Sequence, residues 1–92
     1  MGIQYIFYTE EVRRGTAPDE KIAYVDTEIM DKESGQTLFK GTVPVTVTPF
    51  GVFVSVKSVK EAFTNKKMQA EVLFRLKRYV KKMRDYLDVD EL

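Results

Sequence analysis

The chain contains no cysteine and no histidine. Without cysteine it can form no disulfide bond, thiolate nucleophile or zinc–thiolate site. Without histidine it lacks the side chain that most often serves as a general base near neutral pH, and serine–histidine catalytic pairs are excluded. No glycine-rich run has the spacing of a phosphate-binding or dinucleotide-binding loop. We therefore expect a protein that is not an enzyme and binds no cofactor.

Long apolar runs are missing as well. No stretch approaches the roughly 18 consecutive apolar residues that would cross a bilayer, so we expect no membrane association. A chain without cysteine suits a reducing compartment, and we expect a cytoplasmic location. The 92 residues are 43% hydrophobic and 32% charged, which is typical of a single ordered globular domain spanning residues 1–92.

Four segments within residues 1–57 have the composition or alternation of β-strands. Residues 3–9 are rich in β-branched and aromatic side chains, and residues 21–30, 36–48 and 52–56 alternate apolar with polar or small side chains. The charged segment 10–20, which contains glycine and proline, predicts a long loop after the first strand.

Turn signals connect these strands. Residues 31–35 predict a turn in which glycine supplies a positive φ, and residues 48–51 have proline and glycine at the second and fourth positions of a tight turn. Gly41 and Pro44 interrupt the third strand, and proline cannot donate to a ladder of hydrogen bonds. We expect a bend or bulge at Gly41, with the first half of this strand pairing with the second strand and its second half with the fourth.

A long amphipathic helix is predicted over residues 58–88, followed by an acidic tail over 89–92. Ser58 and Glu61 have the spacing of a capping box, and Thr64 and Asn65 are poor helix formers that would interrupt the helix. An apolar stripe runs along it, formed by Val72, Leu73, Leu76, Tyr79, Val80, Met83, Tyr86 and Leu87. The predicted fold is α+β: a four-stranded antiparallel sheet in ββββα order with the helix packed on one face.

Charge is divided unevenly along the chain. Residues 1–57 hold six basic and eight acidic side chains, a net −2, whereas residues 58–92 hold nine basic and six acidic ones, a net +3. Between Lys66 and Arg84 there are eight basic side chains against Glu71 alone. Such a helix face attracts anions or an acidic protein surface, and the same pattern is typical of the solvated back of a core helix.

Phe74 lies off the apolar stripe. At about 100° per residue it falls roughly opposite the centre of the stripe, among basic side chains. An exposed ring surrounded by cations suits a nucleic-acid base, an acidic peptide or a pocket on a partner, unless the helix is rotated or Phe74 packs on the long loop. The candidate partner-binding residues are Phe74, Lys67, Lys77, Arg78, Lys81, Lys82 and Arg75.

The second face of the sheet also carries apolar side chains. Tyr24 falls opposite the valine face, Phe53 does the same in the fourth strand, and the first strand is apolar on both faces, which a sheet covered on one side does not require. Such side chains are enriched at protein interfaces and also stack on unpaired bases. Asp26 and Glu28 share this face and repel phosphates, which favours a protein interface. The candidate interface residues are Tyr24, Phe53, Ile6 and Tyr8.

Asp26 and Glu28 could also hold a hard cation if an oxygen from Asp31 or Glu33 joined them. Acidic residues on the wet side of a sheet are the simpler interpretation, and we expect no metal site. The sequence thus predicts a small non-enzymatic interaction module that binds proteins, including a second copy of itself. The alternative is nucleic-acid binding through the basic face of the helix. No small-molecule substrate is evident.

Overall fold

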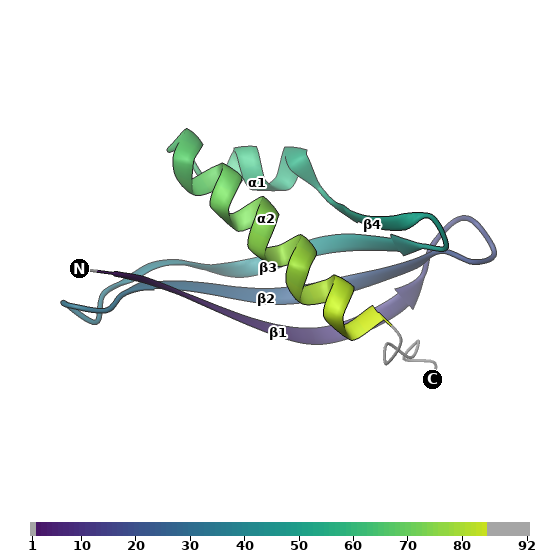
Figure 1. The fold of residues 1–92 in the computed structure, drawn as a ribbon, viewed down its shortest axis with the longest axis horizontal. Helices are drawn as coiled ribbons and strands as arrows, with labels where there is room; N and C mark the ends of the chain where they lie inside the picture. The colour runs from purple at the N-terminus through teal and green to yellow at the C-terminus, as the bar shows by residue number, and fades with distance from the viewer. Residues whose placement is uncertain (1, 85–92) are drawn as a thin grey trace.

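The computed structural model describes residues 2–84, so the predicted tail 89–92 and the predicted helical residues 85–88 lie outside the described part. The strands form one antiparallel sheet in the order β1-β2-β3-β4, and both helices lie over the same face (Figure 1). The predicted α+β fold is confirmed, with two helices after the sheet. The elements are β1 (Ile3–Arg14), β2 (Lys21–Asp31), β3 (Thr37–Thr48), β4 (Gly51–Val54), α1 (Val56–Ala62) and α2 (Lys66–Met83).

The core lies between the sheet and the helices. Alternate residues of β2, β3 and β4 point toward α2 because side chains alternate along a strand. From α2 the predicted stripe contributes Val72 and Leu76, both 0% exposed, and Val80, 1% exposed. The strands contribute Ala23, Val25, Ile29, Val43, Val45, Val47 and Val52. Two stripe residues, Tyr86 and Leu87, lie outside the described residues.

β1 is longer than predicted and continues to Arg14. A β-bulge between Thr9 and Glu11 shifts the pairing with β2. The shift turns Val12 toward the helices, where it is 4% exposed. Much of the segment predicted as a loop is therefore strand, because the bulge breaks the alternation that would have revealed it. The loop that remains is residues 15–20.

β3 pairs with β2 along nearly its whole length, whereas the prediction divided β3 between two partners. Only its last part, Val45–Thr48, also pairs with β4. Pro44 ends the β4 pairing, because it has no N–H to donate on that side. Its carbonyl accepts a hydrogen bond from the N–H of Ser55 at 3.4 Å, where the chain leaves the sheet.

Gly41 makes room for an aromatic ring and lies at no irregularity of the β2–β3 pairing. It lies in a regular part of the β2–β3 ladder, and the register shift occurs instead between Ile29 and Met30. A β-carbon at position 41 would lie 2.9 Å from Cζ of Phe39. The Phe39 ring packs in turn on the Phe63 ring, with 4.5 Å between centroids. The predicted bulge at Gly41 is wrong, and the physical role of Gly41 is packing.

The helical part begins earlier than predicted. The side chain of Ser55, not that of Ser58, caps α1 by accepting a hydrogen bond from the N–H of Ser58 at 3.3 Å. Val56, predicted to lie in the last strand, is the first residue of α1. The predicted capping box of Ser58 and Glu61 is therefore wrong. Ser55 and Ser58 are both residue types that favour the N-cap position. Only the end of the pairing between β3 and β4 shows that Ser55 is the one that caps α1.

The predicted interruption at Thr64 and Asn65 is confirmed. α1 ends at Ala62, and Asn65 is the N-cap of α2. Its Oδ1 accepts hydrogen bonds from two backbone N–H groups in the first turn of α2, at 2.9 and 3.2 Å. The Gln69 side chain donates a hydrogen bond to the carbonyl of Phe63 and so closes the junction between the helices.

Replacing Asn65 with alanine is expected to lower the free energy of unfolding by about 1 kcal/mol, because two N–H groups at the start of α2 lose their acceptor. Urea titration followed by circular dichroism measures this loss. Thr64→Ala is the matched control, since Thr64 is exposed and does not cap the helix. Equal stability of Asn65→Ala and the unaltered chain would contradict the capping role.

Candidate interaction surfaces

Five of the seven basic side chains of α2, together with Arg84 just after it, line two hollows on opposite flanks of the helix. Arg75, Arg78 and Lys82 line a hollow shared with Phe7 of β1. Lys77, Lys81 and Arg84 line another, shared with Phe50, Gly51, Val52 and Phe53 at the β4 side. We call these the β1-side hollow and the β4-side hollow. The structure therefore separates the cations that the sequence grouped around Phe74, and Lys67 lines neither hollow.

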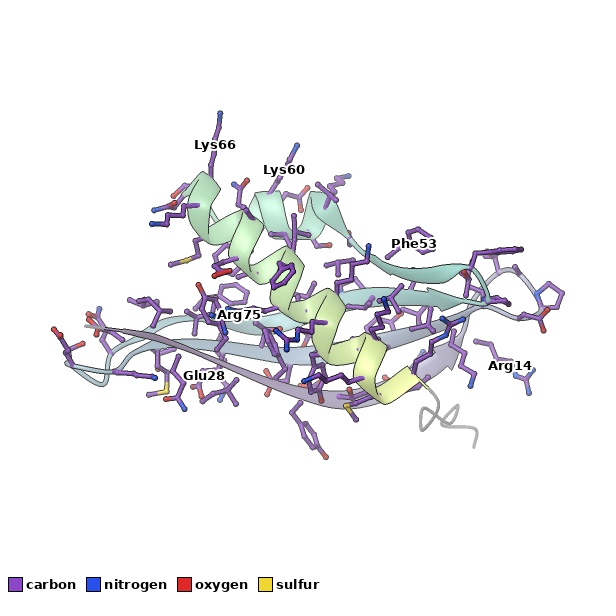
Figure 2. The ribbon with its side chains drawn as sticks, viewed as in Figure 1. Arg14, Glu28, Phe53, Lys60, Lys66 and Arg75 are labelled. Atoms are coloured by element: carbon purple, nitrogen blue, oxygen red, sulfur yellow. The ribbon has the colours of Figure 1, made fainter. Side chains whose placement is uncertain are left out.

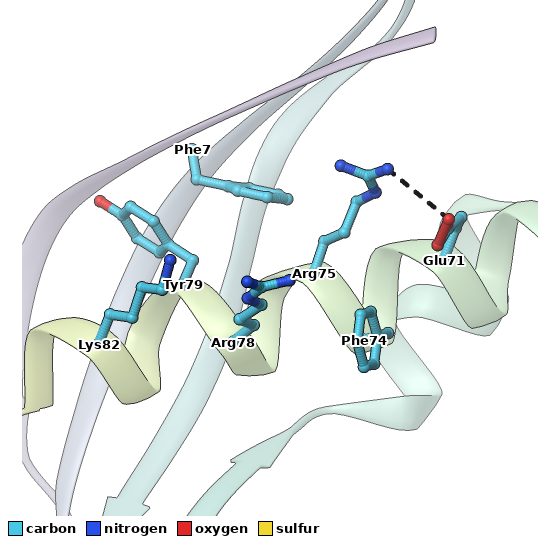
Figure 3. A pocket seen from close by; sticks show the side chains of 7 residues that line it. All are labelled: Phe7, Glu71, Phe74, Arg75, Arg78, Tyr79 and Lys82. Carbon is cyan, nitrogen blue, oxygen red and sulfur yellow. Dashed lines mark ion pairs between the residues drawn. The ribbon is translucent and has the colours of Figure 1, made fainter.

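The β1-side hollow is open and has a volume of about 350 Å³ (Figure 3). The Arg75 guanidinium lies 4.5 Å from the centroid of the Tyr5 ring, and its Nη2 is 3.7 Å from Oε1 of Glu71. Phe74 stands at the rim and is 63% exposed, as its position off the stripe predicted. The lining residues are Phe7, Glu71, Phe74, Arg75, Arg78, Tyr79 and Lys82, so three cations face one carboxylate.

Tyr79 connects α2 to β1, the edge strand of the sheet, through a hydrogen bond and a ring contact. Its hydroxyl oxygen accepts a hydrogen bond from the N–H of Thr9 at 3.2 Å. Its ring lies 5.5 Å, centroid to centroid, from that of Phe7. The stripe placed Tyr79 on the buried side of the helix but carried no signal for this contact. A periodic pattern shows which side of a helix is buried, not which strand it meets.

Two side chains near these surfaces have shifted pKa values. Burial raises the pKa of Tyr5, the Glu71 carboxylate raises it further, and Arg75 opposes both. The hydrogen bond from Arg13 Nε to the Glu11 carboxylate, 2.6 Å long, raises the pKa of Arg13. Both shifts move the pKa of the group further above pH 7. Tyr5 therefore stays uncharged beneath Arg75 at physiological pH, and Arg13 stays charged.

The β4-side hollow, about 190 Å³, contains exposed aromatic rings. Phe50 is 94% exposed and Phe53 is 55% exposed. Arg84 donates a hydrogen bond from Nη2 to the carbonyl of Thr48 at 2.8 Å, which fixes the end of α2 above the β3–β4 turn. The sequence grouped Phe53 with Tyr24, but Phe53 is on the edge strand and lines this hollow beside Lys77. The register keeps Phe53 on the same side of the sheet as Tyr24, because Phe53 pairs with Thr46 and Thr46 pairs with Ile22.

The sheet face turned away from both helices is covered by no helix or strand of residues 2–84 (Figure 2). Tyr8 is 67% exposed and Ile6 39% exposed on this side. The register places Tyr8 opposite Asp26 and Ile6 opposite Glu28. We call this surface the open face. Its apolar members on β1 and β2 are Ile6, Tyr8, Ile22, Tyr24 and Met30.

No group of three acidic side chains suited to a metal ion occurs within residues 2–84. None of the helices described is long and apolar enough to span a bilayer.

A scan against protein-family models and searches of curated proteins and of solved structures found no match to this chain.

Proposed function

We propose that this chain is a small non-enzymatic interaction module whose open face binds protein, and that a second copy of the chain is one such partner. The observation that supports this proposal is the group of apolar side chains on the open face. In an antiparallel sheet covered on one side, the solvated face is ordinarily polar. Here Tyr8 and Tyr24 lie diagonally across the β1–β2 ladder, with Ile6 next along β1. Burial of such side chains is what drives association.

The charges of the open face support pairing between copies. Asp26 and Glu28 lie on β2, while Arg13 on β1 and Lys40 on β3 belong to the same face. A two-fold interface uses one surface twice, so it must be complementary to itself. A face carrying both signs meets this condition, because the acids of one copy can face the bases of the other. The proposal includes a cytoplasmic location, which the lack of cysteine favours.

Light scattering coupled to size exclusion tests the proposal. We expect a dimer at tens of micromolar, and we expect Tyr24→Asp and Tyr8→Asp to convert it to a monomer, because each would bury an unpaired carboxylate. Phe50→Asp is the matched control: it makes the same chemical change at a 94% exposed ring outside the open face. Circular dichroism checks that every variant remains folded. A monomeric unaltered chain at these concentrations would rule out self-association.

Nucleic-acid binding is the second candidate, and the exposed ring of Phe74 beside Arg78 and Lys82 is the observation that favours it. Bases stack on such rings, and cations contact phosphates. Glu71 in the same hollow and the acids of the open face count against it. The charge of the whole chain, +1, is also small for a dedicated nucleic-acid binder.

A further inference from the structure

β1 is an edge strand, and the hydrogen bond at Thr9 shows which of its backbone groups face outward. The N–H of Thr9 points away from β2, to the Tyr79 hydroxyl. Backbone groups alternate in direction along a strand, and the register from Ile3 to Thr9 is regular. The N–H and C=O groups of Ile3, Tyr5 and Phe7 therefore also point outward. Within residues 2–84 no strand lies beside them.

The β1-side hollow opens beside this edge. Arg75 reaches from α2 over Tyr5, and Figure 3 shows Arg75, Arg78 and Lys82 on the part of α2 that lies across from Phe7. Glu71 offsets only one of these three cations. An unpaired strand edge and a basic flank thus lie together on one side of the molecule.

We infer that the edge of β1 from Ile3 to Tyr8, together with the β1-side hollow, binds an extended acidic protein segment that adds a strand to the sheet. An added strand lies about 4.8 Å from β1 and forms main-chain hydrogen bonds to it. Its side chains alternate between the two faces. The row on the helix side meets Arg75, Arg78 and Lys82 and is acidic. The row on the other side lies beside Ile6 and Tyr8 and is apolar.

A second copy of this chain fits the edge poorly. Antiparallel pairing of two β1 strands about a two-fold axis keeps the helices of both copies on one side of the joined sheet. The two basic flanks would then face each other, and like charges repel. A nucleic acid fits poorly as well, because its backbone has few donors for the outward carbonyls of β1. The site borders the open face at Ile6 and Tyr8, but its main-chain hydrogen bonds come from the β1 edge and its positive charge from α2. It extends the interaction role proposed above to a second surface.

Fluorescence anisotropy with a labelled peptide that alternates glutamate and valine tests this inference on the full chain. We expect saturable binding that weakens with salt. The double variant Arg78→Ala and Lys82→Ala is expected to lower the affinity about 3- to 10-fold, because two exposed ion pairs are lost. Lys77→Ala with Lys81→Ala removes the same charge from the β4 side and is expected to leave the affinity unchanged.

Three further probes decide between the inference and its rivals. A lysine–valine peptide, an N-methylated glutamate–valine peptide that cannot pair along one edge, and an oligothymidylate are each expected to bind weakly or not at all. Equal binding of either altered peptide would overturn the inference, as would oligothymidylate binding without glutamate–valine binding. No detectable binding of the glutamate–valine peptide at low salt would overturn it too.

Hydrogen exchange followed by NMR supplies a readout specific to the edge. We expect the peptide to slow exchange at the amides of Tyr5 and Phe7, while amides of β4, on the far edge, are unchanged. Unchanged exchange at Tyr5 and Phe7 with bound peptide would refute strand addition. The Tyr24→Asp chain should bind the peptide like the unaltered chain, so failure of self-association and failure of this inference are distinguishable.

Discussion

Replacing Leu76 with alanine is expected to lower the free energy of unfolding by about 3 kcal/mol. Leu76 is 0% exposed and lies at the centre of the stripe that joins α2 to the sheet. Its removal deletes buried methyl groups and leaves a cavity between the helix and the valines of β3 and β4. Those valines are β-branched and fixed in the ladder, so the surroundings close only part of that cavity.

Urea titration at constant temperature measures the effect of Leu76→Ala. Phe74→Ala is the control, because it removes a large apolar side chain from the same helix at a site that is 63% exposed. It should change the free energy of unfolding by no more than about 0.5 kcal/mol. Similar losses in both variants would show that α2 does not pack through the stripe described above.

The arrangement of sheet and helix could be predicted from the sequence because it rests on two periodicities. Alternation in residues 21–30 and 43–47 identified the buried face of the sheet, and the 3.6-residue period of α2 identified Val72, Leu76 and Val80. The break between α1 and α2 could be predicted because Asn65 prefers a cap to a helix interior. Each signal is local, so a single segment is enough to read it.

The errors have a common physical origin in contacts between distant segments. Val12 was missed because a bulge in the pairing of β1 with β2 shifts the alternation of β1. Gly41 was misread because the Phe39 ring, which packs on the distant Phe63, requires a small residue at position 41. Pairing of Thr9 with Tyr79 joins residues separated by 70 positions. No pattern within either segment indicates it.

The same limit applies to the candidate sites. The angle around the helix placed Phe74 correctly on the exposed side. The sequence could not show that α2 crosses from β4 toward β1, which is what assigns Arg75, Arg78 and Lys82 to one flank and Lys77 and Lys81 to the other. Phe7, Glu71 and Tyr79 were missed as lining residues for this reason.

Replacing Phe63 with alanine is expected to cost about 3 to 4 kcal/mol of unfolding free energy. Phe63 lies at the junction between α1 and α2, is 5% exposed and packs on Phe39. The substitution removes a large ring from a small core and leaves one side of the Phe39 ring without its packing partner. Phe50→Ala is the matched control, because it deletes the same ring at a site that is 94% exposed. It should be nearly neutral.

A double-mutant cycle that combines Gly41→Ala with Phe63→Ala tests whether the Phe39 ring couples these two positions. Alone, Gly41→Ala is expected to cost about 1 to 3 kcal/mol, because the new methyl group presses on the Phe39 ring. After Phe63→Ala, that ring can move into the vacated space, so the same substitution should cost about 1 kcal/mol less. Chemical denaturation of the four proteins gives the coupling energy. Strict additivity would mean that Phe39 does not transmit the strain, and Gly41 would then need another explanation.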